Sequence, residues 1–162
     1  MNRRLVLKAG ALTGAGIAVG AVRPLFAQTI PDRGPRLDLD LVQEFVRVAH
    51  GDLEKTTKML EAQPALVNAT WDWGGGDWET GLGGASHMGN RAIAEHLLSK
   101  GARMDVFCAT MLGKIEIVKA FLADDPKVVD LAGPHRIPLI RHAVAGKQDA
   151  LVELLKAHGA KA

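Results

Sequence analysis

The sequence predicts an all-α fold built from repeated helix-turn-helix units. Hydrophobic residues make up 48% of the 162 residues and charged residues 23%, a balance that excludes a disordered chain. Aromatic residues are only 4%, and Ala, Leu, Val and Gly supply the apolar share, which favours close-packed short helices over a β-sandwich. From Leu39 onward, apolar residues recur at intervals of three or four, as in Ile115, Val118 and Leu122.

The first 27 residues have the pattern of a twin-arginine export signal. Arg3 and Arg4 are followed by apolar residues and Lys8, and then by a weakly hydrophobic, glycine-rich stretch that is too short for a good membrane span. Ala27 offers a small residue at the cleavage position. We therefore expect residues 1–27 to be a signal peptide and the protein to be periplasmic or exported. Membrane attachment is expected only if this segment is retained as an anchor.

Charge and cysteine content exclude several classes of partner and site. The formal charge is +2, but residues 1–27 hold four basic and no acidic side chains, so the remainder has an acidic excess. A chain without a basic run is a poor binder of nucleic acid. Cys108 is the only cysteine, which excludes an internal disulfide and a multi-thiolate metal site. Residues 28–38 mix Pro, Gly and charge without an apolar period, and are expected to be a linker.

The helical part repeats around four glycines that each separate two short apolar-periodic segments, with spacings of 38, 24 and 33 residues. The second unit runs through residues 80–90, and its next segment ends in Leu97-Leu98 and Gly101-Ala102. This order resembles the ankyrin repeat, with its TPLHxAA start, turn glycine, and second helix ending in LL and GA. Gly81 and Gly83 replace the Pro and His of that start. The four glycines are Gly51, Gly89, Gly113 and Gly146.

The resemblance covers residues 39–162 and implies an ankyrin-repeat solenoid of about four repeats after the signal segment and linker. Each helix pair would bury its apolar face against its neighbours, and a turn glycine can adopt a positive φ. The expected repeats are approximately 39–79, 80–103, 104–136 and 137–162.

Repeat spacing indicates where the connections between repeats differ. In ankyrin proteins the connection forms a hairpin finger, and the fingers and first helices make the concave face that binds partners. The spacing of 24 residues is too short for a finger, so residues 101–104 should be a bare turn. The spacing of 38 residues predicts a lengthened finger at residues 68–79, which contains all three tryptophans.

This finger is the candidate binding site. Tryptophan dominates interface hot spots, which favours a recognition loop. The alternative is that the indoles fold back onto the repeats, where Gly81, Gly83 and Gly84 would leave room. By distance from the glycine-rich tip, Trp73 should be the most exposed indole and Trp78 the most buried. The candidate protein-binding residues are Trp71, Asp72, Trp73, Asp77, Trp78 and Glu79.

Metal and catalytic patterns are weaker. His87 and His96 are nine residues apart without an HExxH or His-Cys spacing, so no metal is expected. The acids of the finger lack the alternating register of a calcium loop and are expected to be exposed. The ankyrin resemblance implies that His135 and His142 brace turns by hydrogen bonding. No serine, histidine and acid follow a catalytic order, and no cofactor is expected.

Two classes of function follow. The first is a non-catalytic protein-protein interaction module that binds another protein, still to be identified, through the concave face and the finger. The alternative is a small ligand-binding or carbohydrate-binding protein or hydrolase, with the indoles as a sugar platform and Asp72 or Asp77 as acid or base. Indoles that line a concavity beside a carboxylate would favour a ligand, and indoles on an exposed rim would favour a protein.

Overall fold

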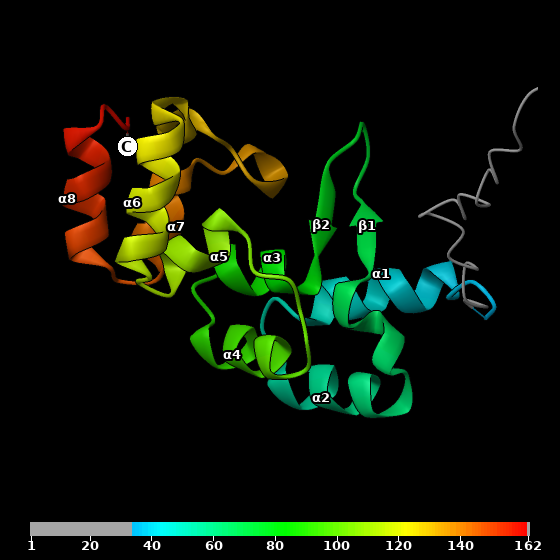
Figure 1. The fold of residues 1–162 in the computed structure, drawn as a ribbon. Helices are drawn as coiled ribbons and strands as arrows, with labels where there is room; N and C mark the ends of the chain where they lie inside the picture. The colour runs from blue at the N-terminus through cyan, green and yellow to red at the C-terminus, as the bar shows by residue number, and fades with distance from the viewer. Residues whose placement is uncertain (1–33, 162) are drawn as a thin grey trace, which may run out of the picture. The chain divides into compact units, whose positions relative to one another are not determined.

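The computed structural model of this chain describes residues 34–161. The expected signal peptide and most of the expected linker lie outside these residues. Within them the chain is mostly helical, with eight α-helices, three short 3-10 helices and one two-stranded sheet (Figure 1). This composition confirms the all-α expectation at the level of fold class. None of the helices between residues 34 and 161 is both long and apolar enough to cross a membrane.

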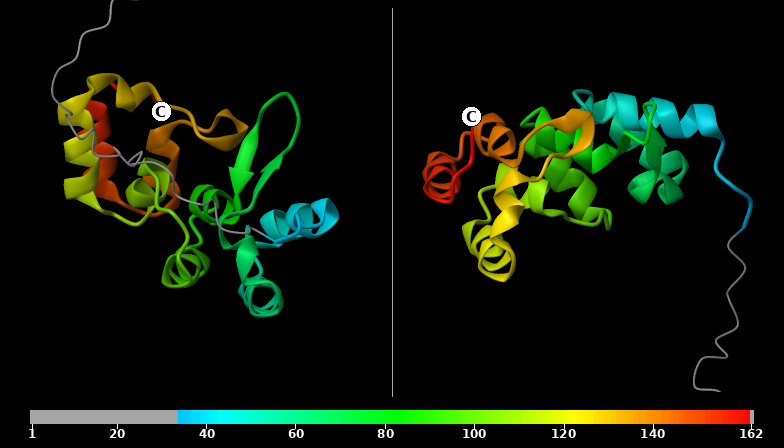
Figure 2. Two further views of the ribbon diagram at one scale, coloured as in Figure 1. Left: turned by 45° about the vertical axis from the view of Figure 1, so that its right-hand side comes forward. Right: turned by 90° about the horizontal axis from the view of Figure 1, so that it is seen from above.

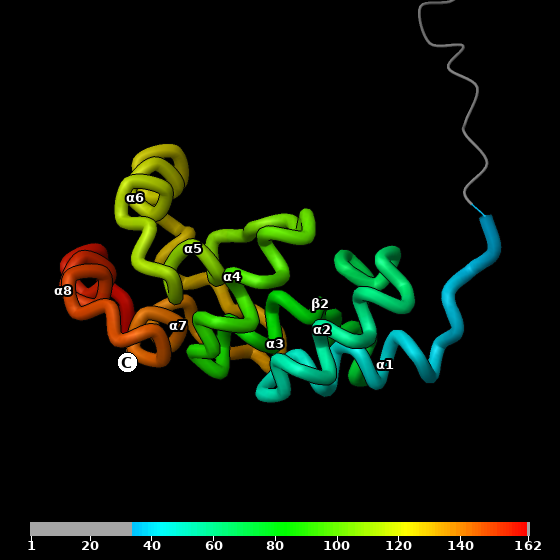
Figure 3. Tube along the Cα trace, turned by 90° about the horizontal axis from the view of Figure 1, so that it is seen from below, coloured from blue at the N-terminus to red at the C-terminus, as the bar shows by residue number. Residues whose placement is uncertain are grey.

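The eight helices form four consecutive pairs. Each pair contacts across a short turn, and the first helices of neighbouring pairs also contact one another in chain order, from α1 through α3 and α5 to α7. Figure 3 shows this succession from below. The helices are α1 (Leu39–Val48), α2 (Leu53–Ala62), α3 (Gly81–His87), α4 (Arg91–Ser99), α5 (Val106–Met111), α6 (Ile115–Asp124), α7 (Leu139–Ala145) and α8 (Asp149–Ala157).

Most of these helices start at a side chain that caps the first turn. The Oδ1 atom of Asp38 accepts a hydrogen bond from the Leu41 amide at 3.0 Å, and Asp52 does the same for Lys55 at 2.8 Å. Thr80, Asn90 and Asp105 cap α3, α4 and α5 in the same way. A cap satisfies an amide that has no partner inside the helix, and removing one costs about 1 kcal/mol.

The core has two parts, one on each side of the middle of the helix stack. The first is built around Phe45, Leu97 and Met111, and joins α1, α2, α3 and α4 to one side of α5. The second joins the remaining helices around Leu139 and Leu155. The candidate site lies above the first part, where α1, α3 and the finger meet.

Each of the four aligned glycines lies between the helices of one pair, as expected. Gly89 and Gly113 have φ angles of +68° and +77°, which confirms the expected left-handed turn. Gly51 and Gly146 do not have a positive φ, and at Gly146 the φ is −78° and the positive φ falls on Lys147. Gly146 is instead required by close packing, since a Cβ there would lie 2.0 Å from the backbone oxygen of Met111.

The finger is an antiparallel hairpin of β1 (Thr70–Asp72) and β2 (Trp78–Thr80), with Trp71 opposite Glu79. Its tip, residues 74–76, is three glycines that all have positive φ. The connection between α4 and α5 contains no strand, as expected from its length. The connection between α6 and α7 holds η2 (Pro126–Asp130) and η3 (Pro134–Arg136) and extends toward the hairpin (Figure 2).

Candidate functional site

The two faces of the hairpin differ because side chains alternate along a strand. Trp71 and Trp73 lie on the inner face and pack against the core, whereas Trp78 on the outer face is 60% exposed. The expectation that Trp73 would be the most exposed indole and Trp78 the most buried is therefore wrong. The exposure of each side chain depends less on its distance from the glycine-rich tip than on the alternation of side chains along the strand. This alternation turns Glu79 inward and its neighbour Trp78 outward.

Glu79 is the centre of a cluster of histidines. Its side chain is buried, and the Trp73 indole N–H donates a hydrogen bond of 2.7 Å to Oε2. The Nε2 atoms of His50 and His135 lie 3.3 and 3.4 Å from the same oxygen, and Nδ1 of His87 lies 3.1 Å from Oε1. Glu79 was expected to be an exposed acid of the partner-binding finger. Its burial among three imidazoles corrects that expectation.

Stacked first helices bring two of these histidines together. His50 lies two residues after the end of α1 and His87 is the last residue of α3, and these two helices contact each other. Their ring centroids are 4.8 Å apart. Gly84 leaves space for the His50 ring, because a Cβ at Gly84 would lie 2.7 Å from the imidazole. The glycine-rich start of α3 thus makes room for a histidine, where a tryptophan had been the alternative.

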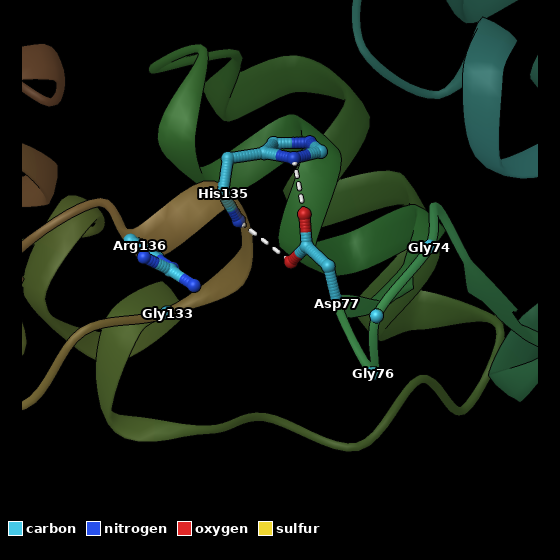
Figure 4. A pocket seen from close by; sticks show the side chains of 7 residues that line it. Gly74, Gly76, Asp77, Gly133, His135 and Arg136 are labelled. Carbon is cyan, nitrogen blue, oxygen red and sulfur yellow. Dashed lines mark hydrogen bonds and ion pairs between the residues drawn. The ribbon is translucent and has the colours of Figure 1, made fainter.

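His135 reaches the cluster from the connection between α6 and α7. Its backbone N–H donates to Oδ1 of Asp77 and its Nδ1 pairs with Oδ2, both at 2.8 Å (Figure 4). Its φ is +57°, a conformation that costs a residue with a side chain about 1 kcal/mol or more. His135 was expected to brace a turn by hydrogen bonding, and its hydrogen-bond partner is in the finger, 58 residues away in the sequence.

Outer hydrogen bonds determine which ring nitrogen of each histidine carries the proton. Nδ1 of His50 lies 2.9 Å from the carbonyl oxygen of Val46, and Nδ1 of His135 pairs with the Asp77 carboxylate. Both partners can only accept, so each Nδ1 carries a proton. In the neutral rings the lone pair of each Nε2 then faces Glu79. These lone pairs and the negatively charged carboxylate repel one another. A positive charge must therefore lie between the nitrogens and the carboxylate.

The electrostatics of the cluster are those of an ionised carboxylate. Burial by itself would raise the pKa of Glu79, but contacts with His50, His87 and Trp73 outweigh burial and hold that pKa well below its ordinary value. The Glu79 carboxylate in turn raises the pKa of His50, against the opposing effect of burial. The backbone N–H of His135 lowers the pKa of Asp77. Both carboxylates are therefore negatively charged at neutral pH.

Two buried atoms of the cluster have no hydrogen-bond partner. They are Oε1 of Glu79 and Nδ1 of His87, which lie at ion-pair distance from each other but outside hydrogen-bond geometry. Unpaired buried polar atoms are rare in proteins and need an explanation. One ligand atom from each of His50, Glu79, His87 and His135 lies within 4.8 Å of the others. This group could hold a metal ion.

The remaining residues that the sequence singled out lie outside the cluster. Asp72 accepts a hydrogen bond from the Gly74 amide at 2.9 Å and stabilises the hairpin turn. The half-buried Trp71 and the exposed Trp78 lie on opposite faces of the hairpin, so the indoles form no common platform for a sugar. His142 accords with its expected role, because its Nδ1 lies 3.2 Å from the carbonyl oxygen of Pro138. His96 contacts Thr57 and does not join the cluster.

Three cavities border the cluster. One of about 420 Å³ is lined by Arg47, His50, Trp73 and His135. A second of about 430 Å³ lies between Arg136 and the glycine tip of the finger, as Figure 4 shows. A third of about 320 Å³ borders His87. The cluster is thus reachable from solvent on more than one side.

Comparisons with protein-family models, with curated proteins and with solved structures found no match to this chain.

Proposed function

We propose that this chain binds a divalent transition-metal ion through His50, Glu79, His87 and His135. One observation carries the proposal. Three imidazole nitrogens and a buried, ionised carboxylate converge within 4.8 Å, and two of their buried atoms have no hydrogen-bond partner. A metal ion between them would satisfy both atoms at once.

The ligand set defines the class of metal. Imidazole favours zinc, copper, iron and nickel, whereas magnesium and calcium prefer sites made of oxygen atoms. Zinc bonds of about 2.0–2.1 Å in a tetrahedron place neighbouring ligand atoms about 3.3–3.4 Å apart. The three contacts of Glu79 with the histidines, 3.1 to 3.4 Å, fall close to that spacing. Zinc is therefore the first ion to test.

The outer shell of the cluster also supports a metal. Metal-bound histidines usually donate their second ring N–H to a carbonyl or a carboxylate, which fixes the orientation of the ring. His50 does so to Val46, and His135 does so to Asp77. Such partners keep the coordinating nitrogens aimed at the ion in the absence of metal. They also explain why the strained backbone at His135 is retained.

Protonated histidines account for the cluster less well than a bound metal ion does. Glu79 and Asp77 together neutralise two imidazoliums, so protonating all three rings would leave one uncompensated positive charge among rings that are 4.8 to 6.5 Å apart. Buried charge of that kind is costly. With a single divalent ion in the cluster, all three rings stay neutral and each donates a nitrogen lone pair to the metal.

The test is a zinc titration of the purified chain by isothermal titration calorimetry, with metal content checked by elemental analysis. We expect one zinc ion per chain. The Glu79→Gln variant, which keeps the size of the side chain, should lose at least about 100-fold in affinity, because it replaces the ionised ligand of the cluster by a neutral amide. His158→Gln is the matched control, since His158 is exposed and lies at the end of α8.

Circular dichroism must show that Glu79→Gln keeps the helical content of the parent. The proposal is contradicted if the parent binds no zinc, or if Glu79→Gln and the parent bind zinc equally well. A folded Glu79→Gln variant without zinc affinity supports it, provided that His158→Gln binds as the parent does.

The scaffold and its location are part of the same proposal. The succession of helix pairs, the turn glycines and the hairpin finger support an ankyrin-type solenoid as the scaffold. The twin-arginine pattern in residues 1–27 supports export of the folded protein. An exported metal site would be assembled before transport, because that pathway carries folded chains.

A second function, binding of another protein through the finger, is favoured by one observation. Trp78 exposes 60% of its surface next to the cluster, and exposed tryptophans often serve as interface hot spots. The test is affinity capture from periplasmic extract with the parent and with Trp78→Ala. A partner that both proteins retain equally would contradict this role.

A further inference from the structure

The third histidine of the cluster lacks the outer partner that the other two possess. His87 directs Nδ1 toward Glu79, and no residue between 34 and 161 hydrogen-bonds to its Nε2. A neutral imidazole that coordinates a metal through Nδ1 must carry its proton on Nε2. Metal binding would therefore leave His87 with an N–H donor that this part of the chain does not pair.

The cavity of about 320 Å³ that borders His87 contains two arginines. Arg136 and Arg141 line it, and neither forms an ion pair within the described part of the chain. Arg136 has a φ of +57°, so its backbone is held in a costly conformation directly after His135. The rest of the wall is apolar and consists of Ile137, Pro138, Val144 and Ala145.

We propose that this cavity binds a small organic acid whose carboxylate accepts hydrogen bonds from Nε2–H of His87 and from Arg136 and Arg141. Such a carboxylate supplies the outer partner that His87 lacks, as Asp77 does for His135. The hydrocarbon part of the acid packs against Ile137, Pro138 and Val144. This inference rests on the proposed metal function, because metal at Nδ1 is what places the proton on Nε2.

The chemistry of the walls favours an organic acid over inorganic phosphate. Arginine pairs well with either group, since its planar N–H donors match both. An apolar wall, however, stabilises a hydrocarbon group and offers nothing to the remaining oxygens of a free phosphate. A cavity of about 320 Å³ lies at the lower end of the sizes found for small-molecule sites, which suits an acid of a few carbons.

Metal and acid should each strengthen the binding of the other. The metal withdraws electron density from the His87 ring and fixes its proton on Nε2, which improves the donor that the acid needs. Linkage requires that the acid raise the affinity for zinc by the same factor by which zinc raises the affinity for the acid. This reciprocity separates a site coupled to the metal from independent binding to surface arginines.

Hexanoate is the probe, with hexanamide as its uncharged analogue and inorganic phosphate as the other anion. Each is titrated calorimetrically into the full chain, with zinc bound and after removal of zinc by chelation. We expect hexanoate to bind the zinc form at least about tenfold more tightly than the zinc-free form, and hexanamide not to bind. Arg141→Gln should weaken hexanoate at least about tenfold and leave zinc affinity without hexanoate unchanged. Arg103→Gln, at an exposed arginine outside this cavity, is the control.

A spectroscopic readout follows the donor itself. In protein labelled with ¹⁵N at histidine, the Nε2–H signal of His87 in the zinc form should shift when hexanoate is added. The acid site is overturned if the chain binds zinc but not hexanoate, or if it binds hexanamide or phosphate but not hexanoate. It is also overturned if Arg141→Gln leaves the affinity for hexanoate unchanged. Failure of zinc itself to bind is recorded in the titration without acid and overturns the metal function as well.

Discussion

At the scale of single residues, Gly84 determines where His50 can lie. A Cβ on residue 84 would lie 2.7 Å from the His50 ring, a separation that real Cβ atoms do not show. The ring must therefore move if residue 84 gains a side chain. A coordinating nitrogen that is displaced by about 1 Å loses much of its bond to a metal, because coordination distances vary by only about 0.2 Å.

We therefore predict that Gly84→Ala lowers the affinity for zinc at least about tenfold while the helical content is unchanged. The matched control is Gly51→Ala, where a Cβ would meet no atom within 4 Å. Calorimetric titration of both variants checks the prediction. Equal zinc affinity in the two variants would mean that the position of His50 does not matter for binding.

His142 determines part of the pH dependence of stability. Burial lowers its pKa, although the carbonyl oxygen of Pro138 partly opposes this, and its Nε2 is buried without a hydrogen-bond partner. As the pH falls through about 6.5, the unfolded chain takes up this proton before the folded chain does. The contribution of neutral His142 to stability is therefore present above about pH 6.5 and is lost as the pH falls through its folded pKa.

His142→Asn should retain a donor to Pro138 and remove this titration. We predict that the free energy of unfolding of the parent falls more steeply between pH 7.5 and pH 5.5 than that of His142→Asn. Urea denaturation at both pH values, with chelator present, gives the comparison. The other histidines are common to both proteins and cancel in the difference. Parallel pH profiles would show that His142 titrates normally in the fold.

At the scale of elements, the hairpin orders the site through the alternation of its strands. Trp71, Trp73 and Glu79 point inward, and Asp72 and Trp78 point outward. The pattern of tryptophans and acids in residues 71–79 contains this alternation, so the sequence could have indicated that Glu79 and Trp78 lie on opposite faces. What it could not indicate is which face would be covered, because that depends on His50 and His87, which lie at the ends of α1 and α3.

The two indoles should differ sharply in their effect on folding. Trp73→Phe keeps an aromatic ring but removes the N–H that Glu79 accepts, and we expect it to cost about 1–3 kcal/mol of stability without metal. Trp78→Ala removes a mostly exposed side chain and should cost less than about 0.5 kcal/mol. Urea denaturation of the zinc-free variants measures both changes. A larger loss for Trp78→Ala would contradict the assignment of the two faces.

The helices and their turns were largely predictable, whereas the cluster was not. Apolar periodicity and turn glycines are local signals, and they marked the helix pairs and the finger. His50 and His87 each stand at the end of a first helix, one and two residues before a turn glycine, so stacking could have suggested that they meet. His135 carries no such signal. It reaches Asp77 across 58 residues of sequence through a connection with no regular period.

At the scale of the whole molecule, the cluster ties together segments that are far apart in the chain. Its ligands come from the end of α1, from β2, from α3 and from η3. Unfolding separates these segments, so the unfolded chain cannot offer the same site. A metal that binds only the folded form stabilises it in proportion to the logarithm of its concentration.

We predict that zinc at about 100 times its dissociation constant raises the free energy of unfolding by about 2.7 kcal/mol. Urea denaturation with and without zinc measures this increase, and the midpoint should move to higher urea with an unchanged slope. Glu79→Gln should show no increase. Equal stabilisation of parent and variant would place the zinc at another position on the chain.

The most direct test of the metal site is a crystal structure of the zinc-loaded protein with an anomalous difference map recorded at the zinc edge. We predict a single strong peak about 2.0–2.2 Å from Nε2 of His50, a carboxylate oxygen of Glu79, Nδ1 of His87 and Nε2 of His135. A zinc ion bound instead at His96 or His158, or a cluster without a peak in crystals soaked with zinc, would contradict the metal site.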